Sequence, residues 1–347
     1  MEFSNVLISW YLHNKRDLPW RNTTNPYPIW LSEIMLQQTR VAQGLPYFLN
    51  FIDTFPTVFD LANATEEMVL KNWQGLGYYS RARNLHATAK YIANDCNGIF
   101  PNTFSSLKKL KGVGDYTAAA IASFSFNEIV PVVDGNVYRV LARYFDIETD
   151  IASNTAKKEF FELASELISK EKPALFNQAI MEFGALQCVP KNPDCTNCIF
   201  NNSCVALQKK KVSQLPIKLK KTKVTKRFLN YIVISDEDEN TIINKRTSKG
   251  IWQNLYEFPV IESQKEENFN TISAQLNNNF FEENRILSIE ERNEKSILHK
   301  LSHQHLNIRF WNVTLLGKIK NGISQKKAAS YPFPIVIYNF IEKHWSL

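Results

Sequence analysis

The 347-residue sequence lacks any apolar run near the roughly 20 residues that a membrane-spanning helix needs. Its first residues, MEFSNVLISWYLHNKRDLPW, also lack the basic start, apolar core and small-residue cleavage site of a signal peptide. These absences predict a cytosolic protein that does not associate with a membrane. No internal repeat is present, and the contents of 44% apolar and 22% charged residues are ordinary for a globular protein. The length is sufficient for two domains with well-buried cores.

Positive charge is not in excess over most of the chain, although the formal net charge is +7. Residues 1–207 hold 18 Lys and Arg against 20 Asp and Glu, and residues 228–347 hold 14 of each. Residues 208–227, QKKKVSQLPIKLKKTKVTKR, hold nine basic residues and no acidic residue. This stretch is interpreted either as a solvated linker or as a tether that lies along phosphates and adds affinity without sequence preference.

The hydrophobic pattern changes at this basic stretch. Before it, WLSEIMLQQ, TEEMVLKNWQGLG, NVYRVLARYF and KKEFFELASELISK are typical of helices joined by short turns. After it, FLNYIVIS and TIINKR flank the acidic turn DEDEN and predict a β-hairpin, and LNIRFWNVTLLGKI alternates as a strand does. The sequence therefore predicts a helical region over 1–207, a basic linker over 208–227 and an α+β domain over 228–347.

Four of the five cysteines lie within 17 residues: Cys188, Cys195, Cys198 and Cys204. Four soft thiolates so close in sequence are typical of a soft metal centre, and disulfides are not expected in a cytosolic chain. The uneven spacing favours an iron–sulfur cluster. Zinc is the alternative, although structural zinc more often pairs two short hairpins. Cys96 stands apart and is expected to be a small apolar residue.

The segment LKGVGDYTA at residues 110–118 predicts a tight turn between two helices. Gly112 and Gly114 permit positive φ and close backbone approach. Their N–H groups, beside the start of the next helix, can seat a phosphate. An ordinary interhelix turn is the alternative for this pattern.

Two acidic residues also invite a functional interpretation. Glu33 lies in a helix that is apolar on almost every side, and burying a carboxylate is unfavourable unless it is paired or protonated. A function is therefore expected for Glu33. Asp134, in VVDGN, opens the helix NVYRV, where an aspartate most often acts as an N-cap.

LKGVGDYTA, the aspartate of PVVDGNVYRV and the four-cysteine loop together resemble the helix-hairpin-helix DNA glycosylases of the endonuclease III superfamily. Within it, WLSEIMLQQTRV, GLGYYSRARNL and the C-terminal domain resemble the MutY family of adenine DNA glycosylases. The resemblance covers nearly the whole chain and is most specific in residues 19–204. It implies a multidomain fold, with an all-α helix-hairpin-helix glycosylase core that carries an iron–sulfur loop, and a C-terminal α+β Nudix-like domain. Within the core it implies a six-helix module over 20–125 and a cluster-bearing module formed by 1–19 with 126–207.

The resemblance also implies a reaction. An enzyme of this family flips adenine mispaired with 8-oxoguanine or guanine out of duplex DNA and hydrolyses its N-glycosidic bond, in base excision repair. Glu33 is then the general acid that protonates N7 of adenine, Asp134 stabilises the sugar oxocarbenium ion, and Asn136 holds that site in register. Bifunctional relatives carry a lysine where this chain has Tyr116, so a monofunctional glycosylase that leaves an abasic site is expected.

The resemblance further implies a cofactor and partners. The four cysteines would hold a [4Fe–4S] cluster, and double-stranded DNA with A:8-oxoguanine or A:G mispairs would be the substrate. The protein is expected to be a monomer in the bacterial cytoplasm, associated with the nucleoid. A clamp or other repair proteins are further expected partners.

DNA contacts and a base pocket are assigned by the same resemblance. The residues expected to fill or frame the duplex, seat a phosphate or read the opposite base are Gln38, Thr39, Leu76, Tyr78, Gly112, Gly114, Ser302 and His303. The residues expected to line the adenine pocket are Trp20, Arg21, Gln178 and Met181. Loop or core packing is the alternative for Leu76, Tyr78, Trp20 and Met181. Arg81 and Arg83 are interpreted either as phosphate contacts or as part of a solvated face.

The C-terminal domain resembles a Nudix fold at GIWQNLYEFP but lacks the Arg-Glu and paired glutamates of the hydrolase pattern, so pyrophosphate cleavage is not expected. The family reads 8-oxoguanine with a Phe-Ser-His loop, and this chain has Leu301, Ser302 and His303 there. Because Leu301 replaces the family's Phe, the resemblance does not determine the conformation of this loop. His299, His303 and His305 also raise a metal site as an alternative, without a nearby Cys or carboxylate array to support it.

Two other functions fit part of these motifs. A bifunctional enzyme for oxidised pyrimidines would share the fold, but Tyr116 and the C-terminal domain argue against it. A non-enzymatic redox or DNA-sensing protein would share the cysteine loop, but it has no need of the pair formed by Glu33 and Asp134.

Overall fold

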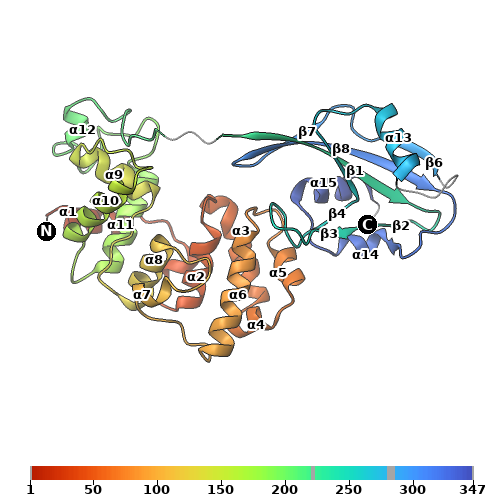
Figure 1. Cartoon of the computed structure of the whole chain (residues 1–347). Coiled ribbons are helices and arrows are strands. Elements are labelled where there is room, and N and C mark those ends of the chain that lie inside the picture. Colours follow the sequence, from red (N-terminus) through yellow and green to blue (C-terminus); the bar gives the residue numbers. More distant parts are fainter. Residues whose placement is uncertain (1, 220–222, 280–285, 346–347) are drawn as a thin grey trace. The chain divides into compact units, whose positions relative to one another are not determined.

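The computed structural model describes residues 2–219, 223–279 and 286–345, which form two compact units (Figure 1). Unit 1 comprises Met1–Asn63 and Asn84–Lys220. Unit 2 comprises Ala64–Arg83 and Lys221–Leu347. Unit 2 therefore includes a segment from the middle of the region predicted to be one helical domain.

Every regular element described in unit 1 is a helix. In chain order these are α1 (Glu2–Asn14), the short 3-10 helix η1 (Pro19–Arg21), α2 (Pro26–Met35), α3 (Val41–Thr54), α4 (Val58–Asn63), α6 (Ser80–Asp95), α7 (Phe104–Leu107), α8 (Asp115–Phe126), α9 (Gly135–Phe145), α10 (Asn154–Leu167), α11 (Pro173–Leu186) and α12 (Val205–Gln208). The helices expected from WLSEIMLQQ, NVYRVLARYF and KKEFFELASELISK are confirmed as α2, α9 and α10. Among all described helices of the chain, none is long and apolar enough to cross a membrane.

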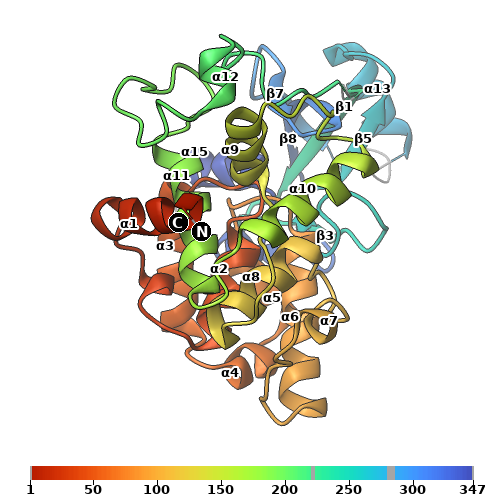
Figure 2. The same cartoon turned by 90° about the vertical axis from the view of Figure 1, so that its left-hand side faces the viewer.

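Helix α1 packs against α11, and α11 packs against α9, although α1 is far from both in sequence (Figures 1 and 2). Phe3, Leu7 and Tyr11 of α1 belong to one buried core together with Phe160 of α10. Their four-residue spacing gives α1 the apolar stripe that a docked helix requires. Phe3 also stacks on Phe200 of the cysteine loop, with 4.9 Å between ring centroids. The N-terminal helix is therefore part of the packing that holds the cysteine loop.

The turn between α7 and α8 contains the two glycines of LKGVGDYTA. Gly112 has φ +80°, and a Cβ there would lie 2.7 Å from Cβ of Asn84, so both the backbone and the close contact require glycine. Gly114 is the N-cap of α8 with φ −91°, and a Cβ there would meet no atom within 4 Å. Gly112 thus adopts the positive φ that glycine permits, whereas Gly114 does not. The open side of Gly114 leaves room for an external group beside the start of α8.

Unit 2 is built on a mixed β-sheet. Its strands, in sheet order, are β5 (Val260–Ser263), β1 (Thr225–Ser235), β8 (Gln304–Leu315) and β6 (Ile286–Glu291), and β7 (Ile297–Lys300) also pairs with β8. Strands β1 and β8 run parallel, and the other described pairs of this sheet are antiparallel. The smaller elements are α5 (Glu66–Asn72), β2 (Asn240–Thr241), β3 (Asn244–Lys245), β4 (Tyr256–Glu257), α13 (Phe269–Asn279), β9 (Ile323–Ser324), α14 (Gln325–Ala329) and α15 (Ile335–His344).

The hairpin expected between FLNYIVIS and TIINKR is wrong. FLNYIVIS lies within β1, but β1 pairs with β5 and β8, while TIINKR contributes to β2 and β3, which pair with β9 and β4. Strand β1 is buried over consecutive residues, as a central strand is, and its parallel partner β8 matches its length. The turn itself is held by Asp236, whose side chain accepts the N–H groups of Asn240 and Ile319, each at 2.9 Å. A segment distant in sequence therefore occupies the place beside this turn.

The basic stretch 208–227 divides between the two units. Leu215 is buried in the core of unit 1, and Lys209 pairs with Asp146 at 2.7 Å. Residues 220–222 lie outside the described residues. The described part of the stretch before them is thus packed on unit 1, and some of its charge is balanced there.

Candidate active site

Helix α2 carries Glu33 into the interior of unit 1. The helix is apolar on nearly every side, with Trp30 fully buried and Glu33 only 6% exposed. Burial raises the pKa of Glu33 to about 7. The hydrogen bond with Tyr116 lowers this pKa, the charge of Asp134 raises it, and the charge of Arg21 lowers it. Glu33 is therefore a carboxyl group that holds its proton near neutral pH.

Tyr116 lies in the first turn of α8, directly after the glycine turn, and hydrogen-bonds Glu33. Burial raises the pKa of Tyr116 well above its usual value, and the charges of Glu33 and Asp134 raise it further. The phenol thus stays protonated and donates its O–H to Glu33. Helix α8 packs beside α2 in both views, which brings the two side chains together (Figures 1 and 2).

Asp134 is the N-cap of α9, as the local sequence predicts. Its Oδ1 accepts the N–H groups of Asn136 at 2.9 Å and Val137 at 2.8 Å, and its Oδ2 accepts Nδ2 of Asn136 at 2.8 Å. Burial raises the pKa of Asp134 above its ordinary value, although these hydrogen bonds oppose the rise because they favour the ionised form. Asp134 is close enough to affect the pKa of both Glu33 and Tyr116. The structure therefore brings together the three residues predicted to be catalytic and the predicted supporting residue Asn136.

Asn177 of α11 holds the segment that leads into Asp134. Its Oδ1 accepts the N–H of Val132 at 3.0 Å, and its Nδ2 donates to the carbonyl of Val130 and to Oγ of Ser123, each at 2.9 Å. The side chain is fully buried, so each of these bonds satisfies a group that water does not reach. No pattern in the sequence points to Asn177.

Asn136 is connected to the cysteine loop through Arg139. Arg139 Nη2 donates to Oδ1 of Asn136 at 2.8 Å and to the carbonyl of Gly184 at 2.6 Å, and its Nε donates to the carbonyl of Cys188 at 2.7 Å. Gly184 permits this close approach of α9 and α11, because a Cβ there would lie 2.7 Å from Cβ of Asn136. A continuous chain of hydrogen bonds thus joins Asp134 to the first cysteine.

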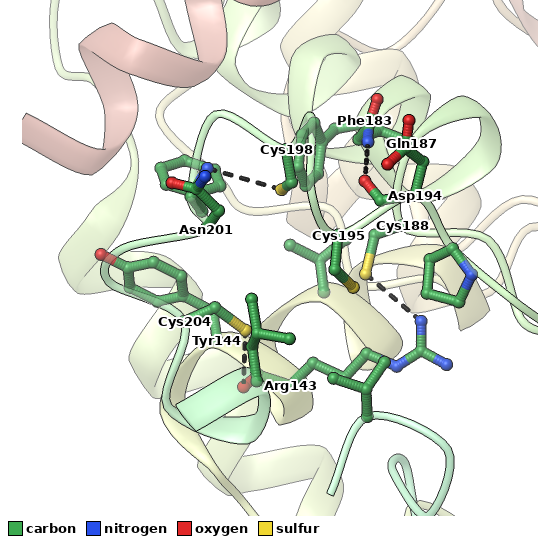
Figure 3. Close-up of a pocket in the computed structure, with 15 residues that line it drawn as sticks. Arg143, Tyr144, Phe183, Gln187, Cys188, Asp194, Cys195, Cys198, Asn201 and Cys204 are labelled. Carbon is green, nitrogen blue, oxygen red and sulfur yellow. Dashed lines mark hydrogen bonds between the residues drawn. The ribbon is translucent and has the colours of Figure 1, made fainter. Parts of the chain in front are cut away.

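The four cysteines line one pocket, and their side chains enter it from different sides (Figure 3). The pocket encloses about 30 Å³, whereas one water needs about 10–15 Å³ by the same measure. Arg143 lies at its edge: Nη1 donates to Sγ of Cys188 at 3.4 Å, and its carbonyl accepts from Sγ of Cys204 at 3.5 Å (Figure 3). The predicted ligand set therefore converges on a common space beside a positive charge.

The cysteines of this pocket are partly buried. Burial raises the pKa of Cys198 to about 11 and also raises the pKa values of Cys195 and Cys204. Over residues 2–219, 223–279 and 286–345, no three His, Cys, Asp or Glu side chains lie close enough together to bind a single metal ion. His299, one of the three histidines of the alternative metal site, packs on the ring of Trp252 with 5.8 Å between ring centroids.

Arg21, predicted to line the adenine pocket, belongs to a buried charged group. Glu182 of α11 accepts Nη1 and Nη2 of Arg21 at 2.8 and 2.7 Å, and Nε and Nη2 of Arg16 at 2.8 and 2.6 Å. Although burial raises the pKa of Glu182, the hydrogen bonds from Arg21 and Arg16 lower it to about 2. Glu182 also lies in a mostly apolar helix, so the signal that identified Glu33 was present for it as well.

The other predicted pocket residues lie close by or in the core. Gln178 accepts the hydroxyl of Tyr11 through Oε1, and the guanidinium of Arg21 lies 5.6 Å from the ring centroid of Tyr11. Trp20 is 9% exposed and contacts Phe48 edge-on, and Met181 packs on the core of unit 1. Arg21 is thus the member of this set that also influences Glu33 electrostatically.

Two of the predicted duplex-contacting residues have a left-handed backbone. Gln38 has φ +56° and Tyr78 has φ +49°, and both side chains are exposed. A non-glycine residue in this region carries strain of roughly 1–3 kcal/mol and is typical of functional loops. Thr39, beside Gln38, donates its hydroxyl to the carbonyl of Gln37 at 3.3 Å. Leu76 is only 4% exposed, which fits the alternative of loop packing.

Arg81 does not lie on a solvated face. Its side chain is 7% exposed and donates to the carbonyl of Gly77 at 3.1 Å. Its guanidinium also lies 5.2 Å from the ring of Trp73 and 5.5 Å from the ring of Tyr78. Arg81 thus packs inside the loop that carries Gly77 and Tyr78. Arg83 donates to the carbonyl of Gln253 at 2.8 Å.

Residues 301–303 form the loop that joins β7 to β8. The N–H of Leu301 donates to the carbonyl of Gln304 at 2.8 Å, and the carbonyl of His303 accepts the N–H of Thr225 at 3.0 Å. The side chains of Ser302 and His303 are exposed at a pocket of about 540 Å³. Oγ of Ser302 lies 2.6 Å from the hydroxyl of Tyr78. Two predicted DNA-contacting residues from distant parts of the chain therefore meet within unit 2.

Comparisons with known proteins agree with this fold. The chain matches the model of the HhH-GPD superfamily of base excision DNA repair proteins over residues 31–169 and that of the NUDIX domain over residues 230–343. It is 37% identical over 309 residues to an adenine DNA glycosylase of Buchnera aphidicola subsp. Schizaphis graminum, covering 88% of this chain and 86% of the relative. It is 42% identical over 222 residues to an adenine DNA glycosylase of Homo sapiens, covering 61% of this chain and 41% of that protein.

Solved structures give the same picture for the helical region. The chain is similar to a thermostable thymine-DNA glycosylase, with TM-score 0.56 and 30% identity, covering 60% of this chain and 95% of the other. It also shares the fold of endonuclease III in a DNA complex, with TM-score 0.52 and 21% identity, covering 60% of this chain and 95% of the other. The predicted helix-hairpin-helix core and C-terminal Nudix-like domain are therefore confirmed.

Proposed function

Because the chain belongs to the adenine DNA glycosylase family, whose members hydrolyse the N-glycosidic bond of adenine, we propose that it removes adenine opposite 8-oxoguanine or guanine without cutting the strand. The observation that carries this proposal is the arrangement of Glu33, Tyr116 and Asp134. One carboxyl group has a pKa of about 7, while the other is an N-cap whose ionised form accepts three hydrogen bonds. Two carboxyl groups in such different environments suit an acid and an anion that act together.

The protonated carboxyl group serves the leaving base. When the bond between N9 of adenine and C1′ of the sugar breaks, its electron pair goes to adenine. A proton from Glu33 to N7 keeps the departing base neutral, and a group with a pKa of about 7 is well matched to this transfer near neutral pH. Tyr116 orients Glu33 through its hydrogen bond. Because its own pKa is well above the usual value, the phenol keeps its proton and Glu33 is the group that gives one up.

The ionised carboxylate serves the sugar. Loss of adenine leaves positive charge at C1′, which Asp134 stabilises as an ion pair or a transient ester. The N–H groups of Asn136 and Val137 hold the carboxylate in place for this role. Water then bonds to C1′ and gives a proton to the carboxylate of Glu33, which restores the acid for the next reaction.

Tyr116 supports the monofunctional outcome. Cutting the strand through a Schiff base requires an amine that attacks C1′, and a phenol has none. Arg21, the cation whose charge reaches Glu33, is a guanidinium paired with Glu182. The proposed product is therefore an abasic site in an intact strand.

The cysteine pocket fits the proposed [4Fe–4S] cluster. It offers four thiolate donors, Cys188, Cys195, Cys198 and Cys204, and it encloses about 30 Å³ beside Arg143. When bound, such a cluster supplies one-electron redox chemistry. The hydrolysis described above consumes no electron, and the role proposed for the surrounding residues is to hold Asn136 in place through Arg139.

The proposal is tested by single-turnover excision on duplexes that place adenine opposite 8-oxoguanine, guanine or thymine. The expected result is fastest release opposite 8-oxoguanine, slower release opposite guanine, and strand breaks only after alkali. Glu33→Gln is the matched control, because it keeps the shape of the side chain and should bind the duplex without releasing adenine. Strand breaks without alkali, or equal rates on all three duplexes, would overturn the proposal.

A further inference from the structure

Residues 64–83 belong to unit 2, although both flanking segments of the chain belong to unit 1. The segment consists of α5, the following loop with Gly75, Gly77 and Tyr78, and the start of α6. Helix α5 lies beside β3 and β4 of the same unit (Figure 1). The loop that presents Tyr78 is thus packed with the C-terminal domain.

The acidic first turn of α5 bonds to the strands β3 and β4 and the loop between them. Oε1 of Glu67 accepts Nζ of Lys245 at 3.0 Å and the hydroxyl of Tyr256 at 2.6 Å. Oε1 of Glu66 accepts Nδ2 of Asn254 at 2.6 Å. A carboxylate that accepts from a cation and a phenol makes the stronger, charge-assisted kind of hydrogen bond.

The end of α5 and the start of the loop bond to the C-terminal helices and their connections. Nζ of Lys71 donates to the carbonyls of Ala329 and Tyr331 at 2.8 and 3.2 Å and lies 4.9 Å from the ring of Tyr338. Oε1 of Gln74 accepts the N–H of Phe333 at 2.9 Å. We name the set formed by Glu66, Glu67, Lys71 and Gln74 the α5 clasp.

The loop beyond the clasp ends beside the residue proposed to read the opposite base. The hydroxyl of Tyr78 lies 2.6 Å from Oγ of Ser302. Arg81 lies against the ring of Tyr78 from within, and Arg83 bonds to the carbonyl of Gln253. From Asn84 onward the same helix, α6, belongs to unit 1, so α6 connects the loop covalently to the helical unit.

We propose that the α5 clasp makes the Tyr78 loop and the loop 301–303 a single body, so that contacts with the base opposite adenine set the insertion of Tyr78 and, through it, the excision rate. The inference rests on the proposed function, because it assumes that Ser302 reads that base. A contact that distinguishes 8-oxoguanine from guanine changes a distant step only if it favours one of two arrangements of an element shared by both sites. The segment 64–83 is that shared element.

The test is a charge exchange across the clasp. Glu67→Lys and Lys245→Glu are each expected to lower the ratio of excision rates opposite 8-oxoguanine and guanine by about tenfold, since like charges then face each other at an interface. The double variant restores an ion pair and is expected to recover the ratio to within about threefold of the wild-type value. The excision rate opposite guanine should change by less than about twofold in all three variants. The loop 301–303 binds guanine only weakly, so coupling through the clasp contributes little to that rate.

Two further variants guard against simple unfolding. Tyr256→Phe removes only the hydroxyl that bonds Glu67 and should lower the ratio in the same direction by about threefold. Glu162→Lys breaks the exposed ion pair of Glu162 with Lys158 on α10, at 3.8 Å, and should leave the ratio unchanged. Thermal unfolding of each variant shows that it is folded at the assay temperature.

The outcomes separate the inference from the function on which it rests. A wild-type ratio near one would overturn the proposed function and this inference with it. A wild-type preference that survives Glu67→Lys and Lys245→Glu unchanged would overturn the inference alone. A lowered ratio that the double variant fails to restore would also contradict it, because the effect would then not pass through this ion pair.

Discussion

Glu33 should make the protein less stable as the pH rises, and Glu33→Gln should remove that penalty. Burial raises the pKa of Glu33 from 4.5 to about 7 in the folded protein. Below pH 4.5 the group is protonated in the folded and unfolded states alike, so the stability linked to its raised pKa is fully present. As the pH rises toward 7, the unfolded chain releases the proton first, and the folded state loses this stability. Above pH 7 the loss is complete and stays constant.

The size of the effect follows from the two pKa values. One pKa unit corresponds to about 1.4 kcal/mol, so the interval from 4.5 to about 7 corresponds to about 3 kcal/mol. Glutamine has the same shape as a protonated glutamate and can still accept the hydroxyl of Tyr116. The free energy of unfolding of Glu33→Gln, relative to that of the wild type, should therefore be higher than in acid by about 1 kcal/mol at pH 5 and by about 3 kcal/mol at pH 8.5.

The assay is hydrogen exchange of the α8 amides at pH 5 and pH 8.5 in wild type and variant, because these amides report on unit 1 alone. The stability difference between the two proteins should grow by about 2 kcal/mol between these pH values. Glu162→Gln, at an exposed position of α10, is the control and should give the same difference at both. If the Glu33→Gln difference does not depend on pH, Glu33 is not protonated in the folded protein and the assignment of the acid fails.

Three other predictions concern the rest of the site. Tyr116→Lys should cut the strand without alkali and form a covalent complex that borohydride traps, because it supplies an amine beside the sugar; a variant that yields only abasic sites would contradict this placement. Asn177→Ala should lower the free energy of unfolding by about 2–4 kcal/mol, because it leaves buried backbone groups of Val130 and Val132 unpaired, and a loss below about 1 kcal/mol in urea unfolding would argue against that role. Cys198→Ser should lower the iron, the sulfide and the brown colour of the purified protein, whereas stoichiometric zinc in the wild type would contradict the proposed cluster.

The reacting groups are visible in the sequence because their signals are local. A glutamate within an apolar helix has few structural explanations, and Glu33 is indeed buried, with its pKa raised to about 7. Asp134 follows an apolar run and opens a helix, and its N-cap bonds reach only to Asn136 and Val137. Gly112 is recognisable from the turn alone, and its φ of +80° agrees.

The supporting residues depend on partners that lie far away in the sequence. Asn177 bonds the N–H of Val132, which is 45 residues away, and Arg139 bonds the carbonyl of Cys188, 49 residues away. Glu182 bonds Arg21 across 161 residues. No periodicity or spacing rule connects such positions, so these pairings emerge only when η1, α9 and α11 are packed together, even where a residue such as Glu182 is itself conspicuous in its apolar helix.

Strand pairing and the place of α5 were equally hard to predict. A local rule pairs β1 with the segment after its turn, whereas its actual neighbours are β5 and β8. The buried backbone N–H and C=O groups along both edges of β1 need hydrogen-bond partners. Helix α5 is recognisable as a helix from TEEMVLKNWQGLG, but its polar residues bond to Lys245, Tyr256 and Ala329. Those contacts, rather than sequence order, assign it to unit 2.

The most direct measurement of the central claim, that Glu33 gives its proton to the departing adenine, is the pH dependence of single-turnover adenine release. With a pKa of about 7, the acid is lost as the pH rises, so the rate should fall above pH 7 and drop about tenfold for each further pH unit. Glu33→Gln should show a low rate without this fall. A wild-type rate that stays constant up to pH 9, or wild-type release by Glu33→Gln, would contradict the account.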